Sequence, residues 1–199
     1  IAVVPFLKIN NATEFEKALK EFQGNAILKT RRLGYDGKGQ KLIKKFKHDI
    51  NYSEIIKNKY IIEYFIKFKK EISVIAIRSK SGKVTTFEPA ENKHKKSILR
   101  ETKYPAAISD SCKANAKKIT KKIANALNIV GVIAVEMFVC EKEKLLVNEI
   151  APRPHNSGHW TLDVCNISQF EALVRTIFKI PIPKIKYYHK CKMVNILGE

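Results

Sequence analysis

The stretch from 148 to 160 constrains this 199-residue chain more than any other part of it. It reads Asn-Glu-Ile-Ala-Pro-Arg-Pro-His-Asn-Ser-Gly-His-Trp and follows an apolar run that predicts a strand. The prolines on either side of Arg153 fix backbone torsions, so the polar groups between them are held in place. A carboxylate at a strand end, followed by a cation and imidazoles, indicates a site for an anionic, metal-bound substrate. A rigid surface turn is the alternative.

The residues before this loop predict a β-hairpin whose strands contain two glutamates. Apolar runs at 129–140 and 144–150 form the strands. A two-residue turn at Lys142 and Glu143 would place Glu136 directly opposite Glu149. Their Cβ atoms would then be roughly 5 Å apart on one face of the sheet. A register slip of one residue would put the two carboxylates on opposite faces.

The surroundings of this glutamate pair predict a metal. On the shared face the pair is flanked by apolar side chains, which are Ala134, Phe138, Leu145 and Val147. Like charges in an apolar setting repel and are poorly solvated, so either a divalent cation lies between them or one carboxyl is protonated. Because Mg²⁺ that accompanies a nucleotide is held by one or two carboxylates and phosphate oxygens, the pair favours an ATP site.

A glycine-rich loop at 34–40 joins two predicted strands, 25–30 and 41–43. Its glycines would let backbone N–H groups approach a phosphate closely, and Lys38 adds positive charge. It is not a P-loop, because the P-loop spacing is absent and a strand follows instead of a helix. A flexible β-turn is the alternative, and the loop alone does not separate the two.

Hydrophobic periodicity predicts the remaining elements. Helices are expected at 11–22, 110–127 and 168–179, and further strands at 59–65, 70–79, 84–88 and 192–197. Residues 1–8 are expected to form a connecting segment. Glu63 and Glu71 bracket the link between two of the strands. There they are either solvated edge residues or ligands of a ribose or an adenine amino group.

The net charge of +19 raises the question of a nucleic-acid partner. The excess consists almost entirely of scattered lysines, since arginine occurs only at positions 31, 32, 78, 100, 153 and 175. No nucleic-acid-binding motif accompanies them. A basic nucleic-acid-binding module is therefore kept as the alternative from a different functional class, while a positive field would also attract anionic small molecules.

The spacing of the cysteines and the hydropathy of the chain indicate in which cellular compartment the protein is expected. The cysteines are widely spaced, at 112, 140, 165 and 191, and form no Cys-x-x-Cys pair. Neither a zinc site nor a disulfide framework is expected, which favours a reducing, cytoplasmic environment. The chain has no run of about 18 apolar residues and no signal-peptide layout at its start, so no membrane partner is expected.

Several of these motifs resemble the ATP-grasp superfamily and, within it, the 5-(carboxyamino)imidazole ribonucleotide synthases. The matching residues are Leu28-Lys29, Gly34-Tyr-Asp-Gly-Lys-Gly-Gln40, Ile62-Glu63, Glu71, Ile98-Leu-Arg100, Gly131-Val-Ile-Ala-Val-Glu136, the stretch 148–160, Ser168-Gln-Phe-Glu171 and Asn195-Ile-Leu-Gly198. The motifs around Lys38 and around Arg153 are specific to the narrower family. One departure is Leu33-Gly34, where the family often has Gly-Gly.

The resemblance implies an α/β (α+β) fold. An ATP-grasp domain would cover residues 1–180, incomplete at its N-terminus, and the truncated start of a small β-rich C-terminal domain would cover 181–199. The implied activity is that of an ATP-dependent carbon–nitrogen ligase of de novo purine biosynthesis. ATP and Mg²⁺ would activate bicarbonate as carboxyphosphate, which would carboxylate 5-aminoimidazole ribonucleotide and release ADP and phosphate. A cytoplasmic homodimer is implied as well. Another ATP-grasp carboxylate–amine ligase is the alternative in the same class.

The resemblance also assigns roles to individual residues. ATP phosphates would be held by Lys29, Gly34, Gly37, Lys38, Gly39 and Gln40. Adenine would be lined by Glu63, Tyr64, Phe65 and Ile66, the ribose hydroxyls would bond to Glu71, and the nucleotide would lie near His94. Mg²⁺ would be held by Glu136 and Glu149, beside Asn148. Bicarbonate or the imidazole ribonucleotide would face Tyr35, Asp36, Arg153, His155, Asn156 and Ser157. Among these, Arg153 would pair bidentately with carboxyphosphate.

Overall fold

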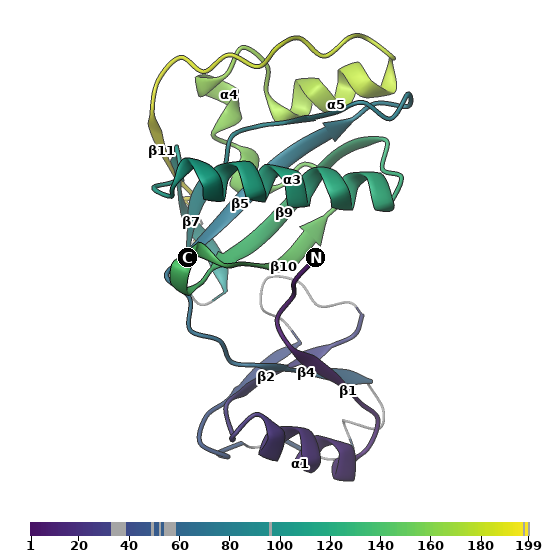
Figure 1. Cartoon of the computed structure of the whole chain (residues 1–199), viewed down its shortest axis with the longest axis vertical. Helices are drawn as coiled ribbons and strands as arrows, with labels where there is room; N and C mark the ends of the chain where they lie inside the picture. The colour runs from purple at the N-terminus through teal and green to yellow at the C-terminus, as the bar shows by residue number, and fades with distance from the viewer. Residues whose placement is uncertain are drawn as a thin grey trace. The chain divides into compact units, whose positions relative to one another are not determined.

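The computed structural model describes residues 1–32, 39–48, 50–51, 53, 59–95, 97–196 and 198. The chain forms two compact units, each with its own sheet (Figure 1). The smaller unit comprises Val4–Lys67 and Lys96–Ile98, and the larger unit comprises Ile1–Val3, Phe68–Lys95 and Leu99–Glu199. Residues on both sides of the expected boundary at 180/181 belong to the larger unit, and a separate C-terminal domain stays a prediction.

The described part of the smaller unit is a four-stranded antiparallel sheet, in the order β1-β4-β2-β3, with a helix packed on it. Its elements are β1 (Phe6–Ile9), α1 (Ala12–Glu21), β2 (Ala26–Thr30), β3 (Gln40–Ile43) and β4 (Tyr60–Tyr64). Helix α1 begins after Asn11, whose side chain accepts a hydrogen bond from the backbone N–H of Glu14 at 2.8 Å. The buried face of α1, with Phe15 and Leu19, closes the core over the sheet.

Strand β1 corrects the expectation that residues 1–8 form a connecting segment. It pairs with β4 along the sheet edge, with Leu7 opposite Ile62, and Ile9 is fully buried. An edge strand of four residues is too short to give a periodicity signal. Its conformation is therefore decided by pairing with a strand more than fifty residues away, which a local pattern does not reveal.

The described part of the larger unit is built on a seven-stranded sheet in the order β10-β9-β5-β7-β8-β11, with β6 paired to β5 beside this path. The strands are β5 (Lys70–Arg78), β6 (Val84–Thr86), β7 (Ala90–Lys95), β8 (Ile98–Tyr104), β9 (Gly131–Val139), β10 (Leu145–Ala151) and β11 (Cys191–Val194). The helices are α3 (Asp110–Ala126), α4 (Thr161–Val164) and α5 (Gln169–Ile177), with 3-10 turns η1 (Glu141–Glu143) and η2 (Asn156–Gly158). No helix in the described ranges is long and apolar enough to cross a membrane.

The two faces of this sheet pack against different parts of the chain. Because alternate residues of a strand point to opposite faces, Val74 of β5 packs with α3, and its neighbour Ile75 packs with Trp160 and α5. Figure 1 shows α3 lying across β5 and β9. Turn η2 contacts β5, and its residue Gly158 lies close to Ile75. The loop after β10, which contains Arg153 and His155, therefore lies on the face opposite α3.

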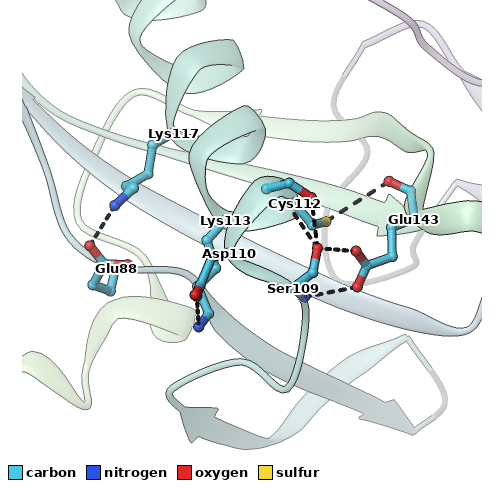
Figure 2. A network of polar contacts seen from close by, with 8 residues as sticks. Glu88, Ser109, Asp110, Cys112, Lys113, Lys117 and Glu143 are labelled. Atoms are coloured by element: carbon cyan, nitrogen blue, oxygen red, sulfur yellow. Dashed lines mark hydrogen bonds and ion pairs between the residues drawn. The ribbon is translucent and has the colours of Figure 1, made fainter.

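A polar network joins the start of α3 to η1 (Figure 2). The hydroxyl of Ser109 caps the helix by accepting from the Cys112 N–H at 3.1 Å. The backbone N–H of Ser109 donates to one carboxyl oxygen of Glu143 at 2.9 Å, and its hydroxyl contacts the other. These bonds lower the pKa of Glu143, and a carboxylate is favourable at a helix N-terminus. The connection between β9 and β10 is thus anchored to α3.

Most of the other predicted elements are present with shifted ends. The helices predicted at 11–22, 110–127 and 168–179 are α1, α3 and α5, and the hydroxyl of Ser168 accepts from the Glu171 N–H at 3.1 Å, as the capping motif predicts. Cys112 lies on the buried face of α3, in the core between this helix and the sheet. Strands β7 and β8 were not predicted. Strand β7 is polar after Ala90, and its buried Asn92 accepts from the hydroxyl of Thr102 in β8 at 3.0 Å.

Candidate functional site

One face of the large sheet gathers the acidic residues that the sequence singled out. Glu136 of β9 lies opposite Glu149 of β10 on one side and opposite Ser73 of β5 on the other. Glu71 is two residues before Ser73 on β5, and it is opposite Asn92 of β7. Because alternate residues of a strand share a face, Glu71, Ser73, Glu136 and Glu149 all project to the same side of the sheet.

The pairing of Glu136 with Glu149 was predicted correctly, but the turn used to predict it was wrong. The strands are joined by η1, with Lys142 and Glu143 at positive φ, and the register begins with Leu145 opposite Val139. Continued unchanged, that register would put Asn148 opposite Glu136. A register shift between Val147 and Glu149 makes Asn148 an extra residue and moves Glu149 into place.

The bulge also changes which apolar residues flank the pair. Ala134 lies on the same face as predicted, opposite Ala151, but Phe138 lies opposite Leu146 instead of Val147. The side chains of Leu145 and Val147 belong to the core under α3, on the other face of the sheet. The expectation that these two flank the glutamates is therefore wrong, because it assumed one register along the whole hairpin.

Glu136 is a buried carboxyl without sufficient compensation. Glu136 is 7% exposed, and its Oε1 atom has no hydrogen-bond partner among the described residues. Burial raises the pKa of Glu136 to about 7; the charge of His94 opposes this rise, and the charges of Glu149 and Glu71 add to it. The hydroxyl of Ser73, its neighbour on β5, is also buried, with no hydrogen-bond partner in the described part of the chain. A hydrogen bond from Ser157 favours the charged form of Glu136 but does not offset the effect of burial on its pKa, so the two neighbouring polar atoms form a candidate ligand site.

A divalent cation fits this arrangement. Carboxylate oxygens are the ligands that Mg²⁺ prefers, and a cation between Glu136 and Glu149 would compensate both charges. The described residues include no group of three or more His, Cys, Asp or Glu side chains that could hold a metal ion. A cation at Glu136 would therefore need oxygens from another source to complete its shell, such as water or the phosphates of a nucleotide.

His94 and Glu71 form an ion pair on the same face, with 2.5 Å between Nδ1 and the carboxyl oxygen. Burial by itself would lower the pKa of His94, but the hydrogen bond and charge of Glu71, with the charges of Glu136 and Glu149, raise it above its ordinary value. The imidazole therefore contributes positive charge to a strongly acidic surface. Glu71, predicted to accept from a ribose, already has one oxygen engaged by His94.

The loop after β10 brings His155 and Ser157 toward Glu136. The Nδ1 atom of His155 is 2.8 Å from the Ser157 hydroxyl and 3.6 Å from Oε1 of Glu136. Ser157 is buried, whereas Asn156 is exposed. Arg153 is also exposed, and its guanidinium donates to the backbone carbonyl of Pro154 at 2.9 Å. The structure thus places His155 and Ser157 beside Glu136, whereas Arg153 and Asn156 are exposed parts of the same loop.

Three residues that hold this loop in place were missed as site residues. They are Gly158, Thr161 and Gln169, which are linked to one another and to His155 by buried hydrogen bonds. Gln169 was seen only as part of a capping motif. The available signal was the spacing of Gln169, Ala172 and Thr176 at i, i+3 and i+7, which puts the glutamine on the inward face of its helix.

The predicted nucleotide residues of the smaller unit form a separate group. Lys29 of β2 pairs with Glu63 of β4 at 2.6 Å. Tyr64 is exposed and contacts Phe22 edge-on, with 5.7 Å between ring centroids. Phe65 and Ile66 follow β4 and are half-buried, and the Phe65 N–H donates to the Asn25 carbonyl at 3.1 Å. Lys29 and Glu63 are therefore brought together, as one site would require.

The glycine-rich loop is described only at its base. Gly34, Tyr35, Asp36, Gly37 and Lys38 lie outside the described residues, so their predicted roles stay predictions. Gly39 has φ +78, and a Cβ there would be 2.5 Å from the Thr30 hydroxyl. The N–H of Thr30 donates to the Gly39 carbonyl at 2.9 Å, and Gln40 begins β3. Only glycine fits at this point of the base.

Comparison with known proteins gives consistent matches. The Bacillus subtilis N5-carboxyaminoimidazole ribonucleotide synthase is 42% identical over 198 residues, which cover 99% of this chain and 52% of that protein. The Aquifex aeolicus protein of the same name is 41% identical, with 98% of this chain and 53% of that protein covered. The chain thus spans about half the length of these relatives.

Solved structures give the same result. An N5-carboxyaminoimidazole ribonucleotide synthetase in complex with ADP matches with a TM-score of 0.90 and 38% identity, covering 100% of this chain and 53% of that one. An Aspergillus clavatus N5-carboxyaminoimidazole synthase in complex with ADP and 5-aminoimidazole ribonucleotide matches with a TM-score of 0.88 and 27% identity, with the same coverage.

The predicted fold class of mixed helices and antiparallel sheets is confirmed by these matches. The family model of the ATP-grasp domain matches residues 1–170, which is most of the chain. This chain therefore belongs to the ATP-grasp family.

Proposed function

We propose that this chain carries the ATP site of an N5-carboxyaminoimidazole ribonucleotide synthase. In that reaction bicarbonate attacks the γ-phosphate of ATP, which yields carboxyphosphate and ADP. The exocyclic amine of 5-aminoimidazole ribonucleotide then takes up the carboxyl group, and phosphate leaves. The proposal is supported by relatives of that name at 36–42% identity and by a structural neighbour that holds ADP and 5-aminoimidazole ribonucleotide.

The observation that carries the proposal is the buried Glu136 carboxyl opposite Glu149. Its raised pKa, its Oε1 without a hydrogen-bond partner in the described part of the chain and the neighbouring charge of Glu149 fit a divalent cation at this position. When bound, Mg²⁺ would neutralise phosphate oxygens that develop charge during transfer. Glu136 and Glu149 would hold it, and the side-chain amide of Asn148, the extra residue of the bulge, would lie beside it.

The remaining groups would divide between the nucleotide and the second substrate. Lys29 would place its ammonium on a phosphate, and Glu71 would accept from the ribose with the oxygen that His94 leaves open. Arg153 is exposed and free to pair bidentately with carboxyphosphate once its bond to the Pro154 carbonyl is exchanged. His155 and Ser157 would face the amine or the carboxyl group beside Glu136.

We further propose that bicarbonate is the carboxyl source and that the protein works in the cytoplasm as a homodimer. The cytoplasmic assignment is supported by the free thiols of Cys112, Cys140, Cys165 and Cys191. A second copy would find exposed apolar side chains on and just after α5, namely Phe170, Val174, Ile177 and Phe178. Sedimentation equilibrium tests this part, and a monomer at micromolar concentration would contradict it.

The first experiment separates the proposal from a nucleic-acid-binding module. Binding of Mg-ATP to the chain is measured by calorimetry for the wild type, for Glu149→Ala and for the control Glu171→Gln, whose carboxylate pairs with Arg175 on the surface. The proposal expects tight binding that only Glu149→Ala abolishes, and no salt-dependent binding of duplex DNA. Salt-dependent DNA binding without Mg-ATP binding would sink the proposal.

The second experiment identifies the substrate. The chain, alone and joined to the segments of the Bacillus subtilis relative that lie outside the matched region, is assayed for ADP release. Release that needs both bicarbonate and 5-aminoimidazole ribonucleotide supports the proposal. Release by the joined protein with a different amine or carboxylate would assign the chain to another ATP-grasp ligase.

A further inference from the structure

Gln169 stands out among the polar residues around the site, because it is fully buried and uses its whole side-chain amide on one residue. Its Oε1 accepts from the backbone N–H of His155 at 3.0 Å. Its Nε2 donates to the backbone carbonyl of the same His155 at 2.7 Å. One amide thereby bonds to both backbone groups of a loop residue, and the His155 carbonyl also accepts from the Gly158 N–H at 2.9 Å.

Thr161 and Gly158 make two further contacts that hold the loop in place. The hydroxyl of Thr161 donates to the Gly158 carbonyl at 2.7 Å and accepts from the Gln169 N–H at 3.0 Å. A Cβ at Gly158 would be 2.5 Å from Oε1 of Gln169 and 2.9 Å from a side-chain carbon of Ile75. The loop is therefore in direct backbone contact with the Gln169 amide, and no larger residue fits between them.

The residue that Gln169 holds is the one that faces the carboxylate pair. The imidazole of His155 lies 2.8 Å from the Ser157 hydroxyl and 3.6 Å from Glu136. The side-chain amide of Gln169 bonds to the backbone of His155 and not to its imidazole. Helix α5 packs on β5 and β9 through Ala172, so the glutamine also ties the loop to the sheet that presents Glu136.

We propose that Gln169 is a positioning residue of the carboxylation site, which sets the His155–Ser157 pair at a fixed distance from Glu136. The inference rests on the proposed function for its catalytic consequence, but not for the positioning itself. No other uncharged side chain of similar size carries both a donor and an acceptor at this reach. Glutamate in its charged form lacks the donor, asparagine is one methylene shorter, and methionine fills the space without either bond.

The test compares Gln169→Met with Thr176→Val. Both variants remove polar atoms from the buried face of α5, but the hydroxyl of Thr176 donates to the Ala172 carbonyl of its own helix and not to the loop. Hydrogen exchange of the His155 amide is measured by NMR on the 199-residue chain. Gln169→Met is expected to speed this exchange roughly tenfold or more, because the amide loses its acceptor. Thr176→Val is expected to leave the exchange unchanged.

The second arm measures ADP release by the protein joined to the flanking segments of the relative. In Gln169→Met, kcat is expected to fall roughly 10- to 100-fold through misplacement of the loop, with KM for ATP within about twofold of the wild type. Gln169→Glu keeps the acceptor for the His155 N–H and is expected to give a smaller loss. Gln169→Leu, which lacks both the donor and the acceptor, replaces Gln169→Met if that variant fails to fold.

The outcomes separate this inference from the proposed function. Unchanged exchange of the His155 amide in Gln169→Met, or in Gln169→Leu where that variant is used instead, would overturn the positioning role. An equal loss of kcat in Thr176→Val would overturn it too, since general packing of α5 would then be the cause. If the wild-type joined protein released no ADP with 5-aminoimidazole ribonucleotide, the proposed function would fail, while the exchange result would still decide whether Gln169 fixes the loop.

Discussion

Each unit of this chain has a pair of charged residues on two hydrogen-bonded strands, and the two pairs differ in whether they need a ligand to balance their charge. In the smaller unit, Lys29 and Glu63 lie 2.6 Å apart, with 18% and 15% of their side chains exposed. In the larger unit, two carboxylates lie opposite each other, and Glu136 is 7% exposed. The first pair compensates its own charge, whereas the second needs a proton or a cation from outside the chain. A buried carboxylate beside a second carboxylate is therefore the stronger indication of a ligand.

The largest expected effect is on the stability of the metal-free chain. Because burial raises the pKa of Glu136 to about 7, the folded chain holds this proton more tightly than the unfolded chain does. The stabilisation is complete below the unfolded value of 4.5 and is lost as the pH rises through about 7. Glu136→Gln should therefore gain on the order of 3 kcal/mol over the wild type near pH 8, and little near pH 5.

Urea unfolding with a chelator present measures this difference at both pH values. The exposed Glu171→Gln serves as the control, because its carboxylate sits on the surface of α5 beside Arg175. A gain of equal size at both pH values would show that packing, and not the carboxyl charge, distinguishes Glu136 from glutamine.

The second largest expected effect is on ATP binding, and it comes from Glu149, the exposed carboxylate of the Glu136–Glu149 pair. Glu149→Gln should weaken Mg²⁺-dependent ATP binding roughly 100-fold, because the cation loses one of its two charged ligands. Binding measured without Mg²⁺ should barely change. Calorimetry with and without the metal checks the prediction, and an equal loss in both conditions would mean that Glu149 contacts the nucleotide directly.

Removing one charge from the Lys29–Glu63 pair should destabilise the chain, whereas removing the Glu136 charge should stabilise it. Lys29→Met leaves the Glu63 carboxylate without its partner at low exposure, so the chain should lose about 1–2 kcal/mol of stability instead of gaining any. The double variant Lys29→Met/Glu63→Leu should recover most of this loss. Thermal unfolding of the three proteins provides the measurement. A stabilised Lys29→Met would remove the contrast between the two pairs.

The smallest effect tests the bulge. Deleting Asn148 removes the extra residue, and the register that begins at Leu145 then brings Glu149 opposite Glu136 without a shift. If Asn148 supplies only its amide, the deletion and Asn148→Ala should each weaken Mg²⁺-dependent ATP binding by about fivefold. A much larger loss on deletion alone would show that the bulge itself aims Glu149 at the metal.

In the β9–β10 hairpin the pairing of the glutamates could be predicted from the sequence, but the turn and the bulge could not. Two carboxylates and apolar alternation predicted the facing pair, and the pair is present. The predicted two-residue turn is wrong, because Glu143 is bonded to Ser109 at the start of α3 and the connection follows η1. The two errors, in the turn and in the missing bulge, cancel at Glu136. They do not cancel nearer the turn, where Val147 packs on the other face.

The sequence by itself determined the ATP-grasp family and the facing glutamate pair, and the ligands predicted for this pair stay predictions. The polar loop, the glycine-rich stretch and the alternating strands are local patterns, which residue type and spacing are enough to reveal. Tertiary structure alone decided that β1 is a strand, that a bulge at Asn148 restores the pairing, and that Gln169 holds the His155 backbone. Each of these depends on hydrogen bonds between residues distant in the chain, whose partners are chosen by packing and not by neighbouring sequence.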